Sequence, residues 1–233
     1  MNIAINETLV KRNTRIAQVA MIAGLLVLAG GMYISFSMPE RFTISLAALM
    51  IGFVLSQVGI YYSNRWARRP RPDEVINKAL KGLDGRHTIY HYLSPVSHLL
   101  VGPTGLWVLI PMHQGGKISY TNGRWKQRGG NFYLKIFAQE SLGRPDLEVA
   151  AQVESMEKFL KQKLGEEDKL PDIQVALLFF SPKAELLVNG DEDAPAYTVK
   201  PDNLKDLVRK KGKQKSISPE YARQVQDLLE YKT

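Results

Sequence analysis

Few side chains in this 233-residue chain could carry out chemistry, and they are scattered. The absence of cysteine excludes a thiolate nucleophile, a disulfide and a cysteine-based zinc site. His98 stands on an apolar run, where we expect a hydrogen-bonded core residue rather than a ligand or a base. The spacing of His87, His91 and His113 predicts no zinc-binding pair on one strand face. The sequence shows no Ser-His-Asp motif, phosphate-binding glycine loop or dinucleotide fingerprint.

The charged candidates are one carboxylate and five lysines. Glu74 could bind a cation, but an acid in the first turn of a helix also complements the helix dipole, and we favour that interpretation. Lys117 follows Gly115-Gly116 and is interpreted as loop surface. The only basic cluster between residues 72 and 233 could contact phosphates or lipid headgroups, although a solvated loop is the commoner meaning; it contains Lys210, Lys211, Lys213 and Lys215.

Two apolar runs and their turns must position these residues. Residues 97–101 and 106–110 are predicted strands, and the Gly-Pro-Thr-Gly sequence between them favours a tight hairpin turn. A second hairpin is expected at Asn122-Gly123, which would pair residues 118–120 with residues 124–127. The soluble part is therefore predicted to contain a β-meander.

The remaining pattern predicts an α/β or α+β domain in which a mixed sheet is flanked by helices. The longest apolar run, residues 173–180, is typical of a central strand buried on both faces. Helices are expected at residues 74–83 (with Asp73 as the cap), 147–164, 203–211 and 219–231. Further strands or extended runs are expected at residues 87–93, 132–137, 186–188 and 197–199.

A two-helix transmembrane hairpin is predicted before this domain. Residues 16–39 and 42–64 lack charges, and each run exceeds the roughly 20 residues that span a bilayer as a helix. Of the net charge of +8, residues 1–71 carry +6, so the basic excess flanks these runs. The positive-inside bias then places both ends of the hairpin in the cytoplasm: a segment at residues 1–15, a basic linker at 65–72 and a domain at 73–233.

The composition of the two spans limits their role. Neither contains Asp, Glu, Lys, Arg or His, which argues against a transporter or channel. Ala48, Gly52 and Ser56 form a ridge of small residues, with Ala20 and Gly24 as partners on the first span. We expect this ridge to pack the hairpin within one chain; the alternative is a homodimer through the same surface.

The stretch from Val96 to Ile118 resembles the NERD family, a nuclease-related domain with a restriction-endonuclease-like core. The residues that fall on the family pattern are Val96, His98, Gly102, Pro103, Gly105, Gly116, Ile118, Gly123 and Trp125. The resemblance extends from Glu74 to about Leu187 and implies a mixed sheet flanked by helices.

The chain departs from the family at its chemical positions. The resemblance places the family's metal-binding Asp at Ser97, its Glu at Ile110 and its Lys at Met112, while an acid on the first helix persists at Glu74. Hard cations such as Mg²⁺ require carboxylate oxygens, which Ile and Met cannot supply. The sequence therefore predicts a nuclease-related domain without a metal or cofactor.

Three hypotheses remain. In the first, a membrane-tethered, non-catalytic module binds nucleic acid or a protein partner. The second is a nuclease dependent on Mg²⁺ or Mn²⁺, with a rearranged site built from Glu74, His98 or Lys117. The third is a structural subunit of a larger membrane complex.

Overall fold

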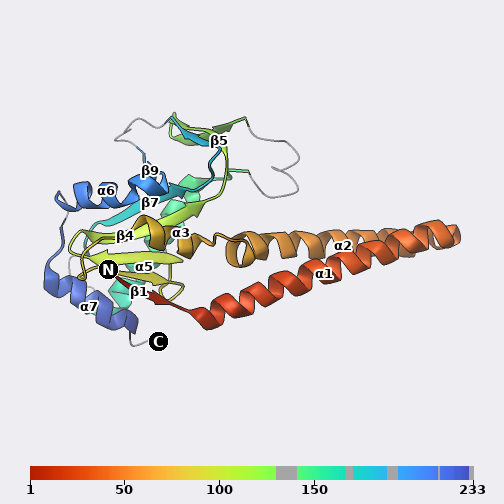
Figure 1. Ribbon diagram of the computed structural model, residues 1–233, viewed down its shortest axis with the longest axis horizontal. Coiled ribbons are helices and arrows are strands. Elements are labelled where there is room, and N and C mark those ends of the chain that lie inside the picture. Colours follow the sequence, from red (N-terminus) through yellow and green to blue (C-terminus); the bar gives the residue numbers. More distant parts are fainter. Residues whose placement is uncertain (130–140, 166–169, 188–193, 215, 231–233) are drawn as a thin grey trace. The chain divides into compact units, whose positions relative to one another are not determined.

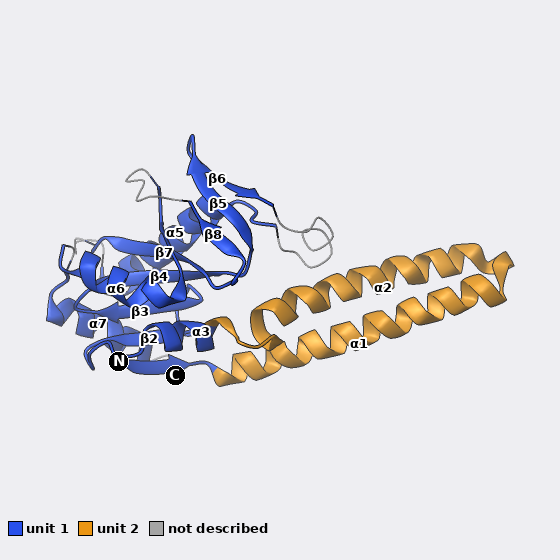
Figure 2. Ribbon diagram, turned by 45° about the horizontal axis from the view of Figure 1, so that its top comes forward, with its two compact units in different colours: residues 1–6, 73–135, 140–233 blue, residues 7–72, 136–139 orange. Residues whose placement is uncertain are grey.

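The computed structural model describes residues 1–129, 141–165, 170–187, 194–214 and 216–230. The chain divides into two compact units (Figure 2). The first contains residues 1–6, 73–135 and 140–233, and the second contains residues 7–72 and 136–139. The predicted run at residues 132–137 lies outside the described residues.

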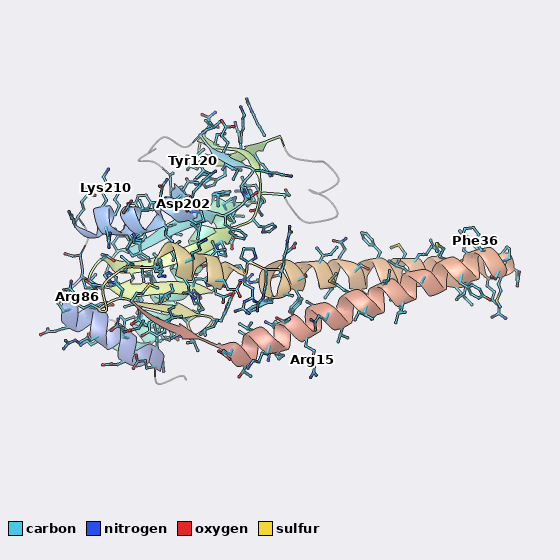
Figure 3. All side chains as sticks on the ribbon, viewed as in Figure 1. Arg15, Phe36, Arg86, Tyr120, Asp202 and Lys210 are labelled. Atoms are coloured by element: carbon cyan, nitrogen blue, oxygen red, sulfur yellow. The ribbon has the colours of Figure 1, made fainter. Side chains whose placement is uncertain are left out.

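The second unit is a pair of antiparallel helices, α1 (Glu7–Ser37) and α2 (Phe42–Tyr62). A 3₁₀ turn at Pro39–Arg41 joins them, and a π-helical turn at Ser63–Ala67 ends the second. Both helices are long and apolar enough to cross a membrane. Their large apolar side chains are mostly exposed, as expected for surfaces that face lipid, and Phe36 at the end of α1 is 80% exposed (Figure 3).

Small residues allow α1 and α2 to approach closely. A Cβ added at Gly52 would lie 2.7 Å from Leu28 Cγ, and one at Gly24 would lie 2.7 Å from Ser56 Oγ. The Ser45 hydroxyl donates a 2.8 Å hydrogen bond to the Gly31 carbonyl on the other helix. The predicted ridge is thus used for packing within one chain, as small-residue surfaces in membrane helices commonly are.

The first unit is built on a six-stranded mixed sheet with the strand order β1-β2-β3-β4-β7-β9 (Figure 1). β2, β3 and β4 form an antiparallel meander, and β7 and β9 continue the sheet in parallel with β4. The strands are β1 (Asn2–Ile5), β2 (Thr88–His91), β3 (His98–Gly102), β4 (Gly105–Met112), β7 (Ile173–Phe179) and β9 (Tyr197–Val199).

Helices cover both faces of this sheet because successive residues of its central strands are apolar on both sides. On one face, Val108 and Ile110 of β4 join the cluster that contains side chains of α5 (Pro145–Leu164) and α7 (Pro219–Glu230). On the other face, Trp107 and Leu109 join the cluster formed with α3 (Pro72–Ala79) and α6 (Pro201–Gly212). The unit is a three-layer α/β structure.

A second, three-stranded sheet has the order β6-β5-β8. The Asn122-Gly123 turn joins β5 (Gly116–Thr121) to β6 (Arg124–Arg128), and β8 (Ala184–Leu186) pairs in parallel with β5. Ile118 and Trp125 on its inner face belong to the same apolar cluster as α5.

The structure confirms the mixed sheet flanked by helices and corrects five details. The predicted meander is split, because the hairpin at Asn122-Gly123 belongs to the smaller sheet. The N-terminal segment contains β1, a strand that is not evident from the sequence and that pairs in parallel with β2. Asp73 lies within the first turn of α3 rather than capping it, and α3 ends at Ala79, four residues before the predicted end at Leu83. The strand near residue 186 begins at Ala184.

Candidate functional site

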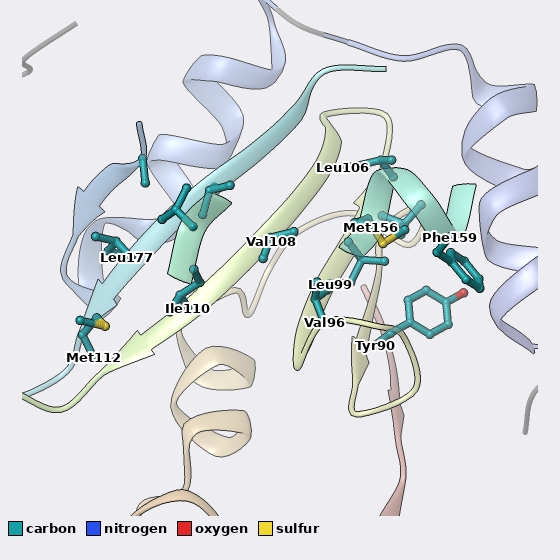
Figure 4. Close-up of a cluster of buried hydrophobic side chains, with 14 of the residues drawn as sticks. Tyr90, Val96, Leu99, Leu106, Val108, Ile110, Met112, Met156, Phe159 and Leu177 are labelled. Carbon is teal, nitrogen blue, oxygen red and sulfur yellow. The ribbon is translucent and has the colours of Figure 1, made fainter. Parts of the chain in front are cut away.

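The structure places the four family positions in different environments. Glu74 lies in the first turn of α3 and is partly exposed, and Ser97 lies half-buried just before β3. Ile110 and Met112 lie near the end of β4, where they are 1% and 3% exposed (Figure 4). Both pack in the apolar cluster between the sheet and α5. Among the described residues, the side chains of the cluster that contains Ile110 and Met112 are apolar.

A polar cluster lies instead at the end of β2. The Nδ1 atoms of His91 and His98 are 2.8 Å apart, and both side chains are buried. The Nε2 atom of His91 lies 2.9 Å from Asn77 Oδ1 on α3. The Tyr92 ring packs edge-on against His98 with a centroid distance of 4.9 Å. His98 is therefore a hydrogen-bonded core residue, as its apolar surroundings predict.

The backbone beside this cluster is unusual. Tyr92 has φ = 62°, in the left-handed region that a bulky residue rarely adopts. Its N–H donates a 2.8 Å hydrogen bond to the Ser97 carbonyl and thereby closes the loop between β2 and β3. The contact between His91 and His98 is not evident from the sequence. The signal that could have revealed it is the register of the strands. Once a loop is placed at residues 92–97, antiparallel pairing of β2 with β3 sets His91 opposite His98.

The other candidates lie apart from this cluster in the fold. Lys117 is on strand β5 of the smaller sheet rather than in the expected loop, and its Nζ atom lies 3.7 Å from Glu185 on β8. Both side chains are more than half exposed, so this ion pair contributes little stability. Among the described residues, no group of three or more His, Asp or Glu side chains converges in a way that could hold a metal ion.

The predicted basic cluster occupies the end of α6. Lys210 is exposed (Figure 3), and Lys211 Nζ lies 5.2 Å from the centroid of the Tyr197 ring. Lys213 follows the helix and is exposed, whereas Lys215 lies outside the described residues. The cations of this last turn also complement the negative end of the helix dipole.

Lys213 also lines an open cleft of about 450 Å³. At its floor, buried His87 joins two segments: its Nδ1 lies 2.9 Å from Asp84 Oδ1 and its Nε2 lies 3.1 Å from Thr104 Oγ1. Arg86 donates to the other oxygen of Asp84 at 3.1 Å and 2.7 Å. The Arg86 guanidinium, aided by His87, holds the pKa of the Asp84 carboxyl far below its usual range.

This cleft is not evident from the sequence because its residues come from three distant segments, and the order Asp-His-Thr follows no familiar spacing. In neutral His87, Nδ1–H donates to Asp84 and Nε2 accepts from the Thr104 hydroxyl, since Asp84 is ionised and can only accept. The hydrogen bonds of His87 to Asp84 and Thr104 hold the loop after α3 and the β3-β4 turn together.

Comparison with models of protein families, with curated proteins and with solved structures finds no match for this chain.

Proposed function

We propose that this chain is a membrane-anchored, nuclease-related protein whose soluble domain binds a partner without divalent-cation catalysis. The observation that carries the proposal is the environment of Ile110 and Met112. The NERD pattern has Glu and Lys at these two positions. In this chain, Ile110 and Met112 lie there in the apolar core, at 1% and 3% exposure. A cation there would lose its hydration shell without gaining oxygen ligands, which is strongly unfavourable.

The element order supports the nuclease-related part of the proposal. α3 is followed by the antiparallel meander β2-β3-β4, then by α5, and then by β7 parallel to β4. A mixed sheet between helices is what a restriction-endonuclease-like core implies. The motif that suggested the family, from Val96 to Ile118, forms the β3-β4 hairpin and the start of β5.

The connectivity supports a membrane anchor with both ends on one side. Residues 1–6 precede α1 and residues 73 onward follow α2, and both stretches belong to the first unit. A pair of spanning helices must then return the chain to the side from which it left. The arginines and lysines that flank α1 and α2 favour the cytoplasm for that side, and anionic lipids would attract the linker at residues 65–72.

The partner proposed for the domain is nucleic acid or another protein. The ridge Ala48, Gly52 and Ser56 faces α1 of the same chain, so a homodimer through the hairpin would have to use another surface of the helices. Assembly into a larger membrane complex would use the exposed apolar surfaces of α1 and α2.

The deciding experiment is a nuclease assay on the full chain in lipid nanodiscs. A fragment beginning at residue 72 is unsuitable because it would lack β1, which pairs with β2 at the sheet edge. Single- and double-stranded DNA would be incubated with Mg²⁺, Mn²⁺ or chelator, beside Glu74→Ala and His98→Ala.

We expect no cleavage above the buffer background under any of these conditions. Cleavage that requires metal and disappears in Glu74→Ala would overturn the proposal in favour of a rearranged nuclease site. Fluorescence anisotropy with the same DNA, without metal, measures binding separately, and co-purification from detergent-solubilised membranes identifies a protein partner.

A further inference from the structure

The cleft beside His87 has the features of a binding site that none of the family positions explains. Its walls come from three segments: the loop after α3, the β3-β4 turn and the end of α6. Arg86, Arg209 and Lys213 contribute cations from two of these walls, and Thr104 contributes a hydroxyl from the third. All of these residues belong to the first unit.

Two of the three cations are held in place before any ligand arrives. Arg86 forms a two-point contact with Asp84, and Arg209 Nη2 donates a 2.8 Å hydrogen bond to the Gly82 carbonyl. Each guanidinium has five N–H groups, so donors remain on both after these bonds are made. A flexible arginine loses side-chain entropy on binding, and prior fixation reduces that loss.

The residues at the floor of the cleft are closely packed. A Cβ at Gly102 would lie 2.4 Å from the His87 ring, and a Cβ at Gly212 would lie 2.4 Å from Thr104 Cβ. Only glycine fits at either position without displacing the imidazole or the turn. His87, through Asp84 and Thr104, therefore sets the distance between the loop that carries Arg86 and the turn that faces α6.

The charges in the cleft favour an anion. The single carboxylate among its described lining residues, Asp84, already accepts hydrogen bonds from Arg86 and His87. The dipole of α6 accounts for cations on its last turn. Arg86, paired with Asp84, reaches the same cleft from a segment more than a hundred residues away in the chain, so three cations and one carboxylate line it.

We propose that this cleft binds the phosphate monoester group of a ligand through Arg86, Arg209 and Lys213, with His87 and Thr104 positioning the floor. A monoester carries about −1.5 to −2 charges at neutral pH and presents three acceptor oxygens, which suits two guanidinium forks and an ammonium. The group could belong to a soluble metabolite or to a lipid headgroup, which offer the same chemistry. This inference is independent of whether the domain cleaves nucleic acid.

The test uses the full chain in nanodiscs of phosphatidylcholine and isothermal titration with glycerol 3-phosphate. Vesicles containing phosphatidic acid, compared with pure phosphatidylcholine vesicles, form the lipid arm. Arg86→Gln and Arg209→Gln remove one guanidinium each. Arg223→Gln is the matched control, because Arg223 is an exposed arginine on α7 that does not line the cleft.

We expect saturable binding of at least one probe, weakened at least tenfold in Arg86→Gln and in Arg209→Gln and unchanged in Arg223→Gln. Arg209→Lys keeps the charge but loses the guanidinium fork, so its affinity for the probe should lie between those of the native protein and Arg209→Gln. Binding only in the lipid arm, with the same variant pattern, assigns the phosphate to a headgroup.

Three results would overturn the proposal. They are no saturable binding of either probe by the native protein, an equal loss in Arg223→Gln, or full competition by an oligonucleotide that lacks terminal phosphates. Thermal unfolding of each variant in the same nanodiscs separates lost binding from lost folding.

Discussion

The Nδ1 atoms of His91 and His98 lie 2.8 Å apart inside the domain, at a position where β2 and β3 are directly opposite one another. This distance requires one Nδ1 to carry the proton and the other to accept it. In a neutral His91 ring, Nε2 carries the proton and donates to Asn77 Oδ1, so Nδ1 accepts and His98 Nδ1–H is the donor. The chain of bonds links β3 through β2 to α3.

Replacing either histidine by alanine should destabilise the domain. The remaining imidazole would stay buried after losing the hydrogen bond between the two rings, which costs about 1–3 kcal/mol in the free energy of unfolding. The double variant His91→Ala/His98→Ala should lose less than the sum of the two single losses, because it removes both ends of the same hydrogen bond. Denaturant unfolding in nanodiscs measures all three; strict additivity would show that the two rings do not interact.

Local sequence patterns predict most helices and strands of this chain. The polar contacts between distant segments can be recognised only once the fold is known. The Gly102-Pro103-Thr104-Gly105 turn and the apolar run at residues 173–180 are local signals, and both elements formed as expected. β1 was missed because four residues before a long helix carry too little periodicity to indicate a strand.

The polar sites depend on register and on long-range packing. The contact between His91 and His98 follows only once β2 and β3 are aligned, which depends on the six-residue loop between them. The cleft depends on the end of α6 meeting the β3-β4 turn, and no pattern in the sequence specifies that approach.

Gly102→Ala should destabilise the protein, because the new methyl group would lie 2.4 Å from the His87 ring. Relieving such a clash by moving a packed side chain typically costs about 1–3 kcal/mol. Gly85→Ala is the matched control: its Cβ would meet nothing within 4 Å, so unfolding should be nearly unchanged. Equal thermal stability of the two variants would contradict the packing described for His87.

Gly52→Leu should separate α1 from α2, since even a Cβ at this position would lie 2.9 Å from the Leu28 backbone nitrogen. Gly30→Leu makes the same chemical change on a surface where a Cβ meets nothing within 4 Å. We expect the first variant to lower the SDS concentration needed to unfold the hairpin and the second to leave it unchanged. Identical SDS midpoints for both would argue against glycine-mediated packing.

The absence of cysteine allows the proposed membrane orientation to be tested with single-cysteine variants. Asn2→Cys and Asp202→Cys should react with a membrane-impermeant maleimide from the same side, because both residues belong to the first unit. Glu40→Cys, at the turn between α1 and α2, should react from the other side. Labelling of intact and permeabilised cells distinguishes the sides, and modification of all three from one side would contradict a spanning hairpin.

Tyr90 should make the domain sensitive to alkaline pH. Burial, together with the negative charge of Glu230, raises the pKa of Tyr90 to about 12 in the folded protein, from 10.0 for the free side chain. The folded state therefore holds this proton more tightly than the unfolded state. The resulting stability is complete below pH 10 and is lost as the pH rises from 10 to 12. At about 1.4 kcal/mol per pKa unit, the loss is roughly 3 kcal/mol.

Tyr90→Phe removes the ionising group while keeping the ring among its apolar neighbours. The difference in unfolding free energy between the native protein and this variant should stay constant up to about pH 10 and then shift in favour of the variant by up to roughly 3 kcal/mol. Other groups that titrate in this range affect both proteins and cancel in the difference. Parallel unfolding curves through pH 12 would show that the Tyr90 hydroxyl ionises as readily in the folded state as in the unfolded one, and that burial on β2 does not exclude the phenolate.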